Sequence, residues 1–346
     1  MTPLFTAFCK NGNEINKKKK AKQEQAVDDA RKQSETRKFT LTVHEIPPEY
    51  RDRYIRSGYR KPGLTFLECL QSLFHWNNEV LNVWTHYITL LLFTWKFCNL
   101  GRDLSQPEYY PLLAYAVGAC MFPLLSCIAH TFSSMSISVR HICFFCDYAG
   151  ISLYSIGSSV AYFFYTIPPD VKSTWLGWAY PPLNVLMAAS CCYVCCISRA
   201  KQWSKYQTVM RACSFAVPYV FCSSFILHKL LISRNSPSSS WFHCSQFFWC
   251  TLMAIAMTTK VPEKYFMEYF DIVGHSHQWF HIFVSVGTNQ QINAVLLDMI
   301  DLENTGQLPL VSFLSSVGLV LLVALVDTAI VVYFSRKILQ KKIKPS

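Results

Sequence analysis

The stretch "GHSHQWFH", residues 274–281, carries three histidines in eight positions and leads directly into an apolar segment. Ionisable side chains at the edge of a lipid phase are rare, because hydrocarbon offers their polar atoms no partners. His277 and His281 stand four residues apart, so a helix would place both on one face. What these histidines do depends on which other residues lie at the same depth, and therefore on the membrane topology.

The rest of the chain has the composition of a helical membrane protein. Its 346 residues are 51% hydrophobic and only 15% charged, whereas soluble domains usually carry about 25% charged residues. The apolar residues gather in windows of about 20 residues, the length at which a helix spans the bilayer core. We predict an all-α polytopic membrane protein, with spans at about 79–99, 108–131, 142–166, 174–197, 209–232, 241–259, 275–299 and 310–334.

The chain divides into four predicted parts. Residues 1–38 are polar and basic, and we expect a disordered cytoplasmic arm that touches membrane lipids or is simply solvated. Residues 39–78 form a juxtamembrane segment, in which "GLTFLECLQSLFHW" predicts an amphipathic helix lying on the membrane. Residues 79–299 hold seven spans, and residues 300–346 hold the eighth span with a basic cytoplasmic tail. The net charge of +11 lies mostly in the two tails, which argues against nucleic acid as a partner.

Basic residues in the loops predict the orientation of the spans. The loops on the side of the amino terminus hold six, and the opposite loops hold three. The six are Arg140, Arg199, Lys201, Lys205, Lys260 and Lys264, and the three are Arg102, Lys172 and Arg234. Both tails are also basic, and an even number of spans puts them on one side. We therefore predict that the amino and carboxyl termini are cytoplasmic.

This orientation brings distant polar residues to one depth. His130 ends the second span, Asp147 lies about two turns into the third, and the pair His277 and His281 begins the seventh. Two histidines on one helix and a third from another form a usual tripod for zinc, with a fourth position left for water. Asp147 would accept a hydrogen bond from that water or orient a ligand ring. The alternative is that backbone groups or lipid headgroups satisfy each histidine.

Other polar residues lie close to this group. Glu79, Asn82 and His86 share one face of the first span, and Glu79 would support a metal ligand or handle a proton. A helix cap or headgroup contact is the alternative for Glu79. His275 lies on a different face from His277, and we expect it on the solvent side. Asp327 lies inside the eighth span and has no evident partner. An acid inside a span would suit an ion or solute carrier, but this is the least favoured class of function.

Three motifs carry a resemblance to a known family. "NNEVLNVWTH" (77–86), "SCIAHTFSSMS" (126–136) with "RHICFFCDYAGI" (140–151), and "FDIVGHSHQWFH" (270–281) resemble, in order, motifs of the progestin and adipoQ receptor family. Details such as "HTFSSMS" and "GHSHQ", with the eighth span, are similar to its membrane progestin receptor branch. Members of that branch often have Leu where Trp279 stands, and Pro-Gly where this chain has Met267 and Glu268. These departures leave the subtype and the ligand open.

The resemblance implies a fold, a site and a function. The fold is a seven-helix transmembrane core of the adiponectin-receptor type with an eighth C-terminal span. The site is zinc at His130, His277 and His281, with Ser126 and Asp147 beside the water on the metal. The function is a plasma-membrane receptor for progestin-like steroids, with a heterotrimeric G protein as a candidate partner. The alternative is a zinc-dependent, ceramidase-like hydrolase of lipid amides, with a sphingolipid ligand, either as the signalling mechanism or as the main activity.

The residues themselves leave room for a steroid site. An apolar bundle with a few polar groups in its middle suits a steroid, which needs an apolar pocket and one or two fixed hydrogen bonds. Polar residues inside the predicted spans supply such groups, or else bridge neighbouring helices. They are Asn184, Gln246, Asn289, Gln290, Gln291 and Asn293.

Overall fold

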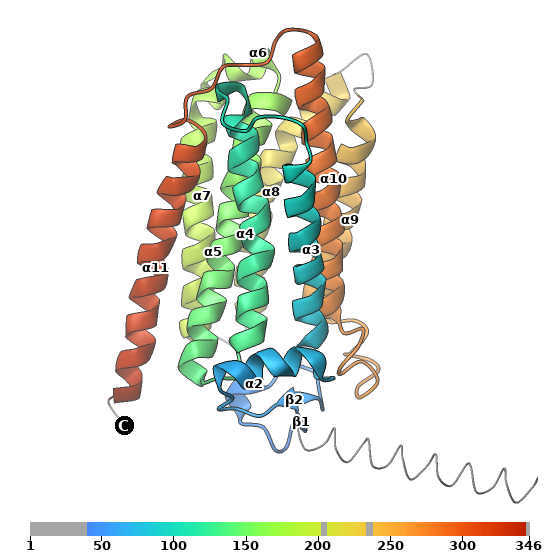
Figure 1. Ribbon diagram of the computed structural model, residues 1–346, viewed down its shortest axis with the longest axis vertical. Coiled ribbons are helices and arrows are strands. Elements are labelled where there is room, and N and C mark those ends of the chain that lie inside the picture. Colours follow the sequence, from blue (N-terminus) through green and yellow to red (C-terminus); the bar gives the residue numbers. More distant parts are fainter. Residues whose placement is uncertain (1–39, 202–205, 233–237, 344–346) are drawn as a thin grey trace, which may run out of the picture.

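The computed structural model describes residues 40–201, 206–232 and 238–343, so the arm predicted for residues 1–38 lies outside it. Eight long helices run side by side along one axis (Figure 1). They are α3 (Val80–Cys98), α4 (Tyr110–Phe132), α5 (Ile137–Ala161), α7 (Trp175–Ala200), α8 (Gln207–Ile232), α9 (Ser240–Thr259), α10 (Ser276–Asn304) and α11 (Val317–Ile343). Shorter pieces join them at one end, namely η3 (Pro107–Tyr109), η4 (Tyr162–Thr166) and α6 (Pro169–Lys172).

The first seven helices coincide with predicted spans to within five residues at each end. The eighth does not, because it was expected from residue 310 and begins at Val317. Serine side chains hold the residues before it in a turn, where Ser312 Oγ accepts from the amide of Ser315 at 3.1 Å. Ser316 Oγ donates to the carbonyl oxygen of Ser312 at 2.8 Å. These local bonds compete with the helix and delay its start.

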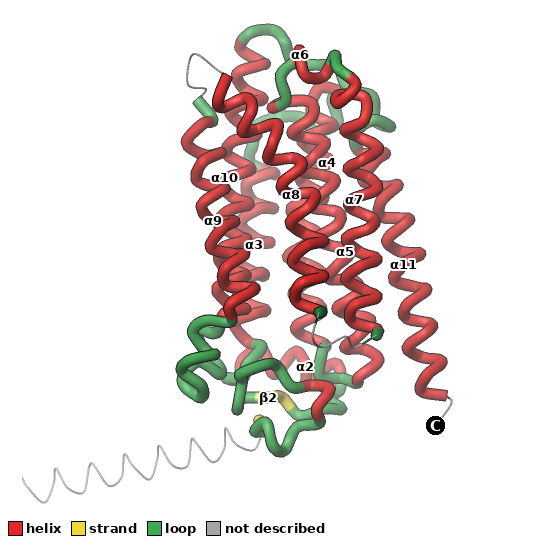
Figure 2. Tube along the Cα trace, turned by 180° about the vertical axis from the view of Figure 1, so that it is seen from behind, coloured by secondary structure: helices red, strands yellow, loops and turns green. Residues whose placement is uncertain are grey.

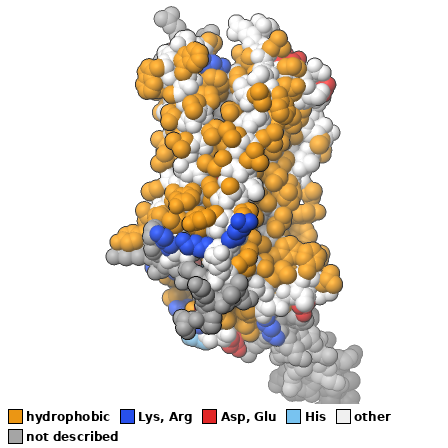
Figure 3. All heavy atoms as spheres, turned by 90° about the vertical axis from the view of Figure 1, so that its left-hand side faces the viewer, with side chains coloured by type: hydrophobic (Ala, Val, Ile, Leu, Met, Phe, Trp, Pro, Cys, Tyr) orange, Lys and Arg blue, Asp and Glu red, His pale blue; other side chains and the backbone are white. Residues whose placement is uncertain are grey.

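The helices differ in how well they suit a lipid environment. Four stretches of the described chain are long and apolar enough to cross a membrane: Pro107–Phe132, Trp175–Ala200, Gln207–Leu231 and Val317–Gln340. The other four long helices carry more polar side chains, and several of these are buried inside the bundle. Figure 3 shows apolar side chains covering most of one face, with Lys and Arg gathered toward its lower end. The fold is therefore a helical membrane fold. That all eight long helices cross the membrane stays a prediction.

Helices α4 and α5 pack with almost no space between them. A Cβ added to Gly118 would lie 2.5 Å from the carbonyl oxygen of Leu153, and one added to Gly157 would lie 2.6 Å from that of Ala114. The missing side chains let the two backbones approach, as small residues do between membrane helices. This contact fixes the positions of the side chains that α4 and α5 contribute to the site.

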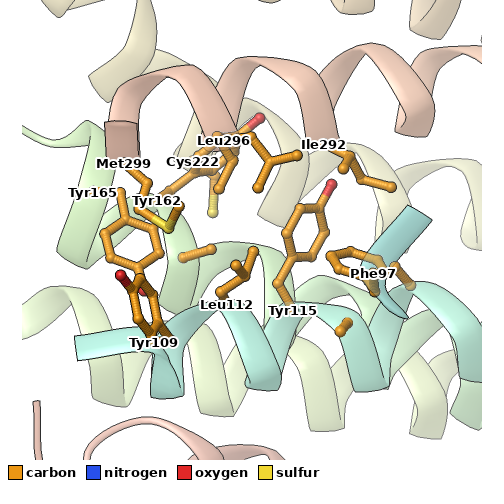
Figure 4. Close-up of a cluster of buried hydrophobic side chains, with 14 of the residues drawn as sticks. Phe97, Tyr109, Leu112, Tyr115, Tyr162, Tyr165, Cys222, Ile292, Leu296 and Met299 are labelled. Atoms are coloured by element: carbon orange, nitrogen blue, oxygen red, sulfur yellow. The ribbon is translucent and has the colours of Figure 1, made fainter. Parts of the chain in front are cut away.

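Toward the α6 end, the interior is aromatic and aliphatic. Figure 4 shows Tyr109 of η3 beside Tyr165, and Tyr115 of α4 beside Phe97 and pointing toward Ile292, with Leu112 between them. These side chains are buried, and burying a large apolar side chain contributes roughly 1.5–3 kcal/mol.

The opposite end is closed by the segment before α3. Strands β1 (Thr40–Leu41) and β2 (Tyr59–Arg60) pair antiparallel, and η1 (Pro48–Tyr50), α2 (Phe66–Gln71) and η2 (Ser72–Phe74) complete it. Helix α2 lies across the bundle end, which Figure 2 shows from behind. It exposes the apolar side chains of Phe66, Leu67 and Leu70. It lies within the stretch for which the sequence predicts an amphipathic helix, and its contact with a membrane stays a prediction. The end of α11 lies at this α2 end too (Figure 1).

Candidate metal centre

Three histidines meet near the α2 end of the bundle. His130 comes from the last turn of α4, and His277 and His281 come from the first turns of α10. One ring nitrogen of each lies within 4.8 Å of those of the other two. The Nε2 atoms of His130 and His277 are 3.3 Å apart. Residues separated by about 150 positions in the chain thus lie at one depth, as the topology predicted.

Hydrogen bonds decide which nitrogens carry protons. Nδ1 of His130 lies 2.7 Å from Glu79 Oε2, and Nδ1 of His281 lies 3.0 Å from the carbonyl oxygen of Asn82. A carboxylate and a carbonyl only accept, so both Nδ1 atoms donate, and in the neutral ring each Nε2 keeps a lone pair. Glu79 is itself held by Asn82 Nδ2 at 2.7 Å. Acceptors behind histidine ligands are the usual second layer of a zinc site.

The arrangement fits a cation. The lone pair on His130 Nε2 faces the other two rings, and neutral imidazole nitrogens in mutual contact repel unless a proton or a metal ion lies between them. Three imidazole nitrogens from two helices are a donor set that zinc accepts. Arg60 fixes one side of the group, because its guanidinium donates to the carbonyl oxygens of His130 and Thr131 at the end of α4.

Two cavities meet at the histidines. The first, here called the basic chamber, opens at the α2 end and is lined by Arg140, Arg199, Arg211, Lys260 and His130, among others. The second, here called the apolar chamber, lies deeper and is lined by Phe122, Tyr154, Tyr162, Ser126 and His281, among others. Residues common to both linings include Asp147, Phe215, His277 and Phe280. The predicted site residues Ser126 and Asp147 therefore line the apolar chamber together with His277 and His281, and Asp147 also lines the basic chamber with His130.

A polar network crosses the apolar chamber. Gln291 Oε1 accepts from the hydroxyl groups of Tyr115 at 2.6 Å and Tyr154 at 2.5 Å. Its Nε2 donates to the hydroxyl of Tyr162 at 2.7 Å, which in turn donates to Gln246 Oε1 at 2.9 Å. An amide nitrogen carries two N–H groups, so Gln291 retains one donor beyond this network.

Comparison with known proteins agrees with the motifs. The family described as haemolysin-III related matches residues 74–292, more than half of the chain. Membrane progestin receptor delta of Mus musculus is 35% identical over 271 residues, covering 75% of this chain and 78% of that protein. Membrane progestin receptor gamma of Homo sapiens is 35% identical over 268 residues, covering 75% and 81%. Membrane progestin receptor gamma-B of Danio rerio is 33% identical over 328 residues, covering 86% and 94%.

The chain belongs to this family. It is a helical membrane protein of the progestin and adipoQ receptor family, in the branch of the membrane progestin receptors. The matched residues 74–292 include the first six long helices and the part of α10 up to residue 292, together with all three histidines of the cluster. The histidine cluster and the lining of the apolar chamber thus lie within the part of the chain that the family shares, whereas the basic chamber is also lined by Asp52, Arg53 and Ile55, which precede it.

The expectation that His275 lies on the solvent side was wrong. His275 is buried rather than on the solvent side, and its Nε2 lies 3.1 Å from the carbonyl oxygen of Asn78. It occupies the N-cap of α10 in an extended conformation, so it does not follow the helical spacing on which the expectation rested.

His86 is closer to the centre than the sequence indicated. Its ring stacks on His281 with centroids 3.7 Å apart and planes at 5°. Its two nitrogens are buried and form no hydrogen bond with a described residue. The signal for it was the face of α3 that it shares with Glu79 and Asn82.

Other polar residues do not join the site. Asn289 Oδ1 accepts from Lys96 Nζ at 2.9 Å, and Asn293 accepts from the same ammonium, so these two bridge α10 and α3. His243 contacts Asp298 at 3.0 Å in the other half of the bundle. Asp327 is buried in α11 and lines neither chamber.

Proposed function

We propose that this protein is a receptor for progestin-like steroids in the plasma membrane, with both termini cytoplasmic. The relatives named membrane progestin receptors support this ligand class, and the apolar chamber carries the argument. Its exposed surface is mostly apolar, and the groups of the polar network around Gln291 hold one another in place. A steroid needs this combination of an apolar surface and one or two fixed polar contacts.

The polar contact is assigned to Gln291. Its amide nitrogen has one N–H left after the bond to Tyr162, and a ketone oxygen of a progestin accepts such a donor. The hydroxyl groups of Tyr115 and Tyr154 hold the amide in orientation. The binding energy comes mostly from burial of the steroid skeleton, and the amide fixes its direction in the chamber.

Saturation binding of radiolabelled progesterone to the purified protein tests this proposal. We expect Gln291→Leu to weaken binding about tenfold or more, because the ketone loses its partner and the tyrosine hydroxyls are left unpaired. Gln290→Leu is the matched control, since Gln290 directly precedes Gln291 in α10 and does not line the apolar chamber. Equal affinity of the two variants, or no saturable binding by the wild type, would contradict the steroid site.

We also propose that His130, His277 and His281 hold zinc, and that a heterotrimeric G protein couples to the cytoplasmic end. Zinc bound there would polarise a carbonyl group and bring the pKa of a bound water toward about 7. In the receptor, Glu79 and Asn82 would orient the histidines, and the metal would join α4 to α10 next to the ligand chamber.

A second function is favoured by the way the apolar chamber reaches the histidines. Asp147 and Ser126 both line the chamber, so a lipid amide extending to His277 would meet a carboxylate and a hydroxyl. Asp147 would take up a proton, and Ser126 would donate a hydrogen bond to the substrate carbonyl. This set of groups suits a zinc-dependent, ceramidase-like hydrolase of lipid amides.

Asp147→Asn separates the two functions. If the protein is a hydrolase, ceramide hydrolysis should fall by about 10² to 10⁴, while progesterone binding stays close to that of the wild type. The reason is that the carboxylate acts on the reacting groups and not on the apolar body of the ligand. A wild type that binds progesterone but releases no fatty acid in a chelator-sensitive way would exclude the hydrolase.

A further inference from the structure

The basic chamber gathers more positive charge than the histidine centre requires. Arg140 of α5, Arg199 of α7, Arg211 of α8 and Lys260 at the end of α9 all line it. These four residues come from four different helices. In the sequence analysis, Arg140, Arg199 and Lys260 served only as loop cations that mark the cytoplasmic side. Their convergence on one cavity is a separate property, which orientation alone does not require.

The carboxylates around this cavity are mostly engaged. Asp52 pairs with Arg140 at 3.8 Å, and Glu79 is bound to His130. Glu263 accepts from the amide of Ser276 at 2.7 Å and also from its hydroxyl. Asp147, the remaining acid, lies at the boundary with the apolar chamber.

Three cations are therefore left over. Arg199, Arg211 and Lys260 form no salt bridge with any residue in the described ranges. Nε of Arg199 is buried and has no hydrogen-bond partner in the same part of the chain. A buried guanidinium N–H without an acceptor is costly, and an anion in the chamber would supply that acceptor.

The guanidinium groups are held in place by aromatic rings. Arg199 lies 4.0 Å and Arg140 lies 5.4 Å from the ring centroid of Phe144. The ring of Phe144 in turn contacts His130, with centroids 5.4 Å apart. Arg211 lies over Tyr148, and its Nε donates to Ser198 Oγ at 3.0 Å. Stacked, oriented guanidinium groups suit the tetrahedral oxygens of a phosphate.

We propose that the basic chamber binds the phosphate group of a membrane lipid whose apolar part extends into the apolar chamber. The two cavities share Asp147, His277 and Phe280, so a single molecule can occupy both. Along this path the lining changes from cationic, through the histidines, to apolar, which is the order of polarity in a lipid with an anionic headgroup. The proposal goes beyond the steroid receptor, because it requires neither zinc, nor a steroid, nor hydrolysis.

Titration of the purified full-length protein with two matched lipids tests the proposal. One is an N-acylsphingosine carrying a phosphate monoester, and the other is the same lipid with its free hydroxyl. Native mass spectrometry reports the bound fraction of each. We expect the phosphorylated lipid to bind about tenfold tighter or more, because hydrogen bonds to charged groups are stronger than those to neutral ones. Arg211→Gln/Lys260→Gln should remove this preference and leave the affinity for the unphosphorylated lipid unchanged.

The control variant is Arg336→Gln/Lys337→Gln, which removes the same charge from the exposed end of α11, outside the chamber. It should keep the preference for phosphate. If both double variants lose it equally, general surface charge explains the binding and the site is overturned. If inorganic phosphate alone displaces the lipid at equal concentration, the chamber is a free-phosphate site and the lipid proposal is wrong. Lys260→Gln alone, at a helix end, serves if the double variant does not fold, and it should weaken the preference.

Discussion

Glu79 and His130 lie 51 residues apart in the chain, and their side chains are joined by a hydrogen bond of 2.7 Å between Oε2 and Nδ1. The contact connects the start of α3 to the end of α4. It fixes the tautomer of His130, so that Nε2 presents its lone pair to His277 and His281. The carboxylate also adds negative charge behind the ring, which makes the imidazole a stronger metal ligand.

Replacing this carboxylate should weaken the metal site without removing a ligand. We expect Glu79→Gln to lower zinc affinity by about 10- to 100-fold, the usual effect of losing a group behind a histidine ligand. Zinc retained against a graded chelator measures this. Asp103→Asn is the control, because Asp103 is exposed at the other end of the bundle and its side chain bonds, within the described part of the chain, to its neighbours Ser105 and Gln106. Equal retention by wild type and Glu79→Gln would show that Glu79 does not support a metal.

The histidine cluster could be predicted because two simple rules sufficed. Helical spacing paired His277 with His281, and the count of spans placed His130 at the same depth. Helical phase also put Glu79, Asn82 and His86 on one face. The burial of His275 could not be predicted, because an N-cap residue leaves the helix and its direction depends on the preceding turn. Spacing did not indicate that His86 stacks on His281, since that contact depends on how α3 packs against α10.

The remaining differences come from tertiary packing and local side-chain bonds. A hydropathy window finds apolar residues from position 310 onward, but serine bonds to the backbone keep residues 312–316 out of the helix. Arg199 and Lys260 entered the sequence prediction only as loop cations, and Arg211, inside the predicted span 209–232, did not enter it. Their meeting in one chamber depends on the packing of α7, α8 and α9, which no periodicity in a single segment reports.

The contact between α4 and α5 should be sensitive to one methyl group. In Gly118→Ala, the new Cβ would lie 2.5 Å from the carbonyl oxygen of Leu153, so the helices must separate. We expect a loss of about 1–3 kcal/mol in the free energy of unfolding, measured by thermal or denaturant unfolding in detergent. Gly287→Ala is the matched control, because its Cβ would meet nothing closer than 3.4 Å. Equal stability of the two variants would contradict the close packing of α4 and α5.

The cap of α2 should respond to acid. Glu68 accepts from the amide and hydroxyl of Thr65, and these hydrogen bonds hold the pKa of the carboxyl below its ordinary value of 4.5. The stabilisation is complete above pH 4.5 and is lost as the pH falls through the depressed pKa. Amide exchange of residues 65–71, corrected for intrinsic rates, should therefore accelerate in acid. In Glu68→Gln the acceleration should be absent, and an unchanged acid response in that variant would exclude the cap as its cause.

The orientation can be tested with tags on Met1 and Ser346. The basic residues of the loops, six against three, predict that an antibody reaches both tags only after the cells are permeabilised. An extracellular epitope inserted beside Arg102 should be labelled in intact cells. Labelling of the amino-terminal tag in intact cells would place the histidine cluster and the basic chamber at the outer leaflet.

Elemental analysis of the purified protein tests the metal centre most directly. We expect one zinc per chain in the wild type, and a fall to background in His277→Ala/His281→Ala. The cluster would then keep only one of the three nitrogens that meet within 4.8 Å. His275→Ala, which removes a buried histidine two residues away from the cluster, should keep its zinc. Undiminished zinc in a correctly folded His277→Ala/His281→Ala protein would contradict the assignment of these histidines as the metal site.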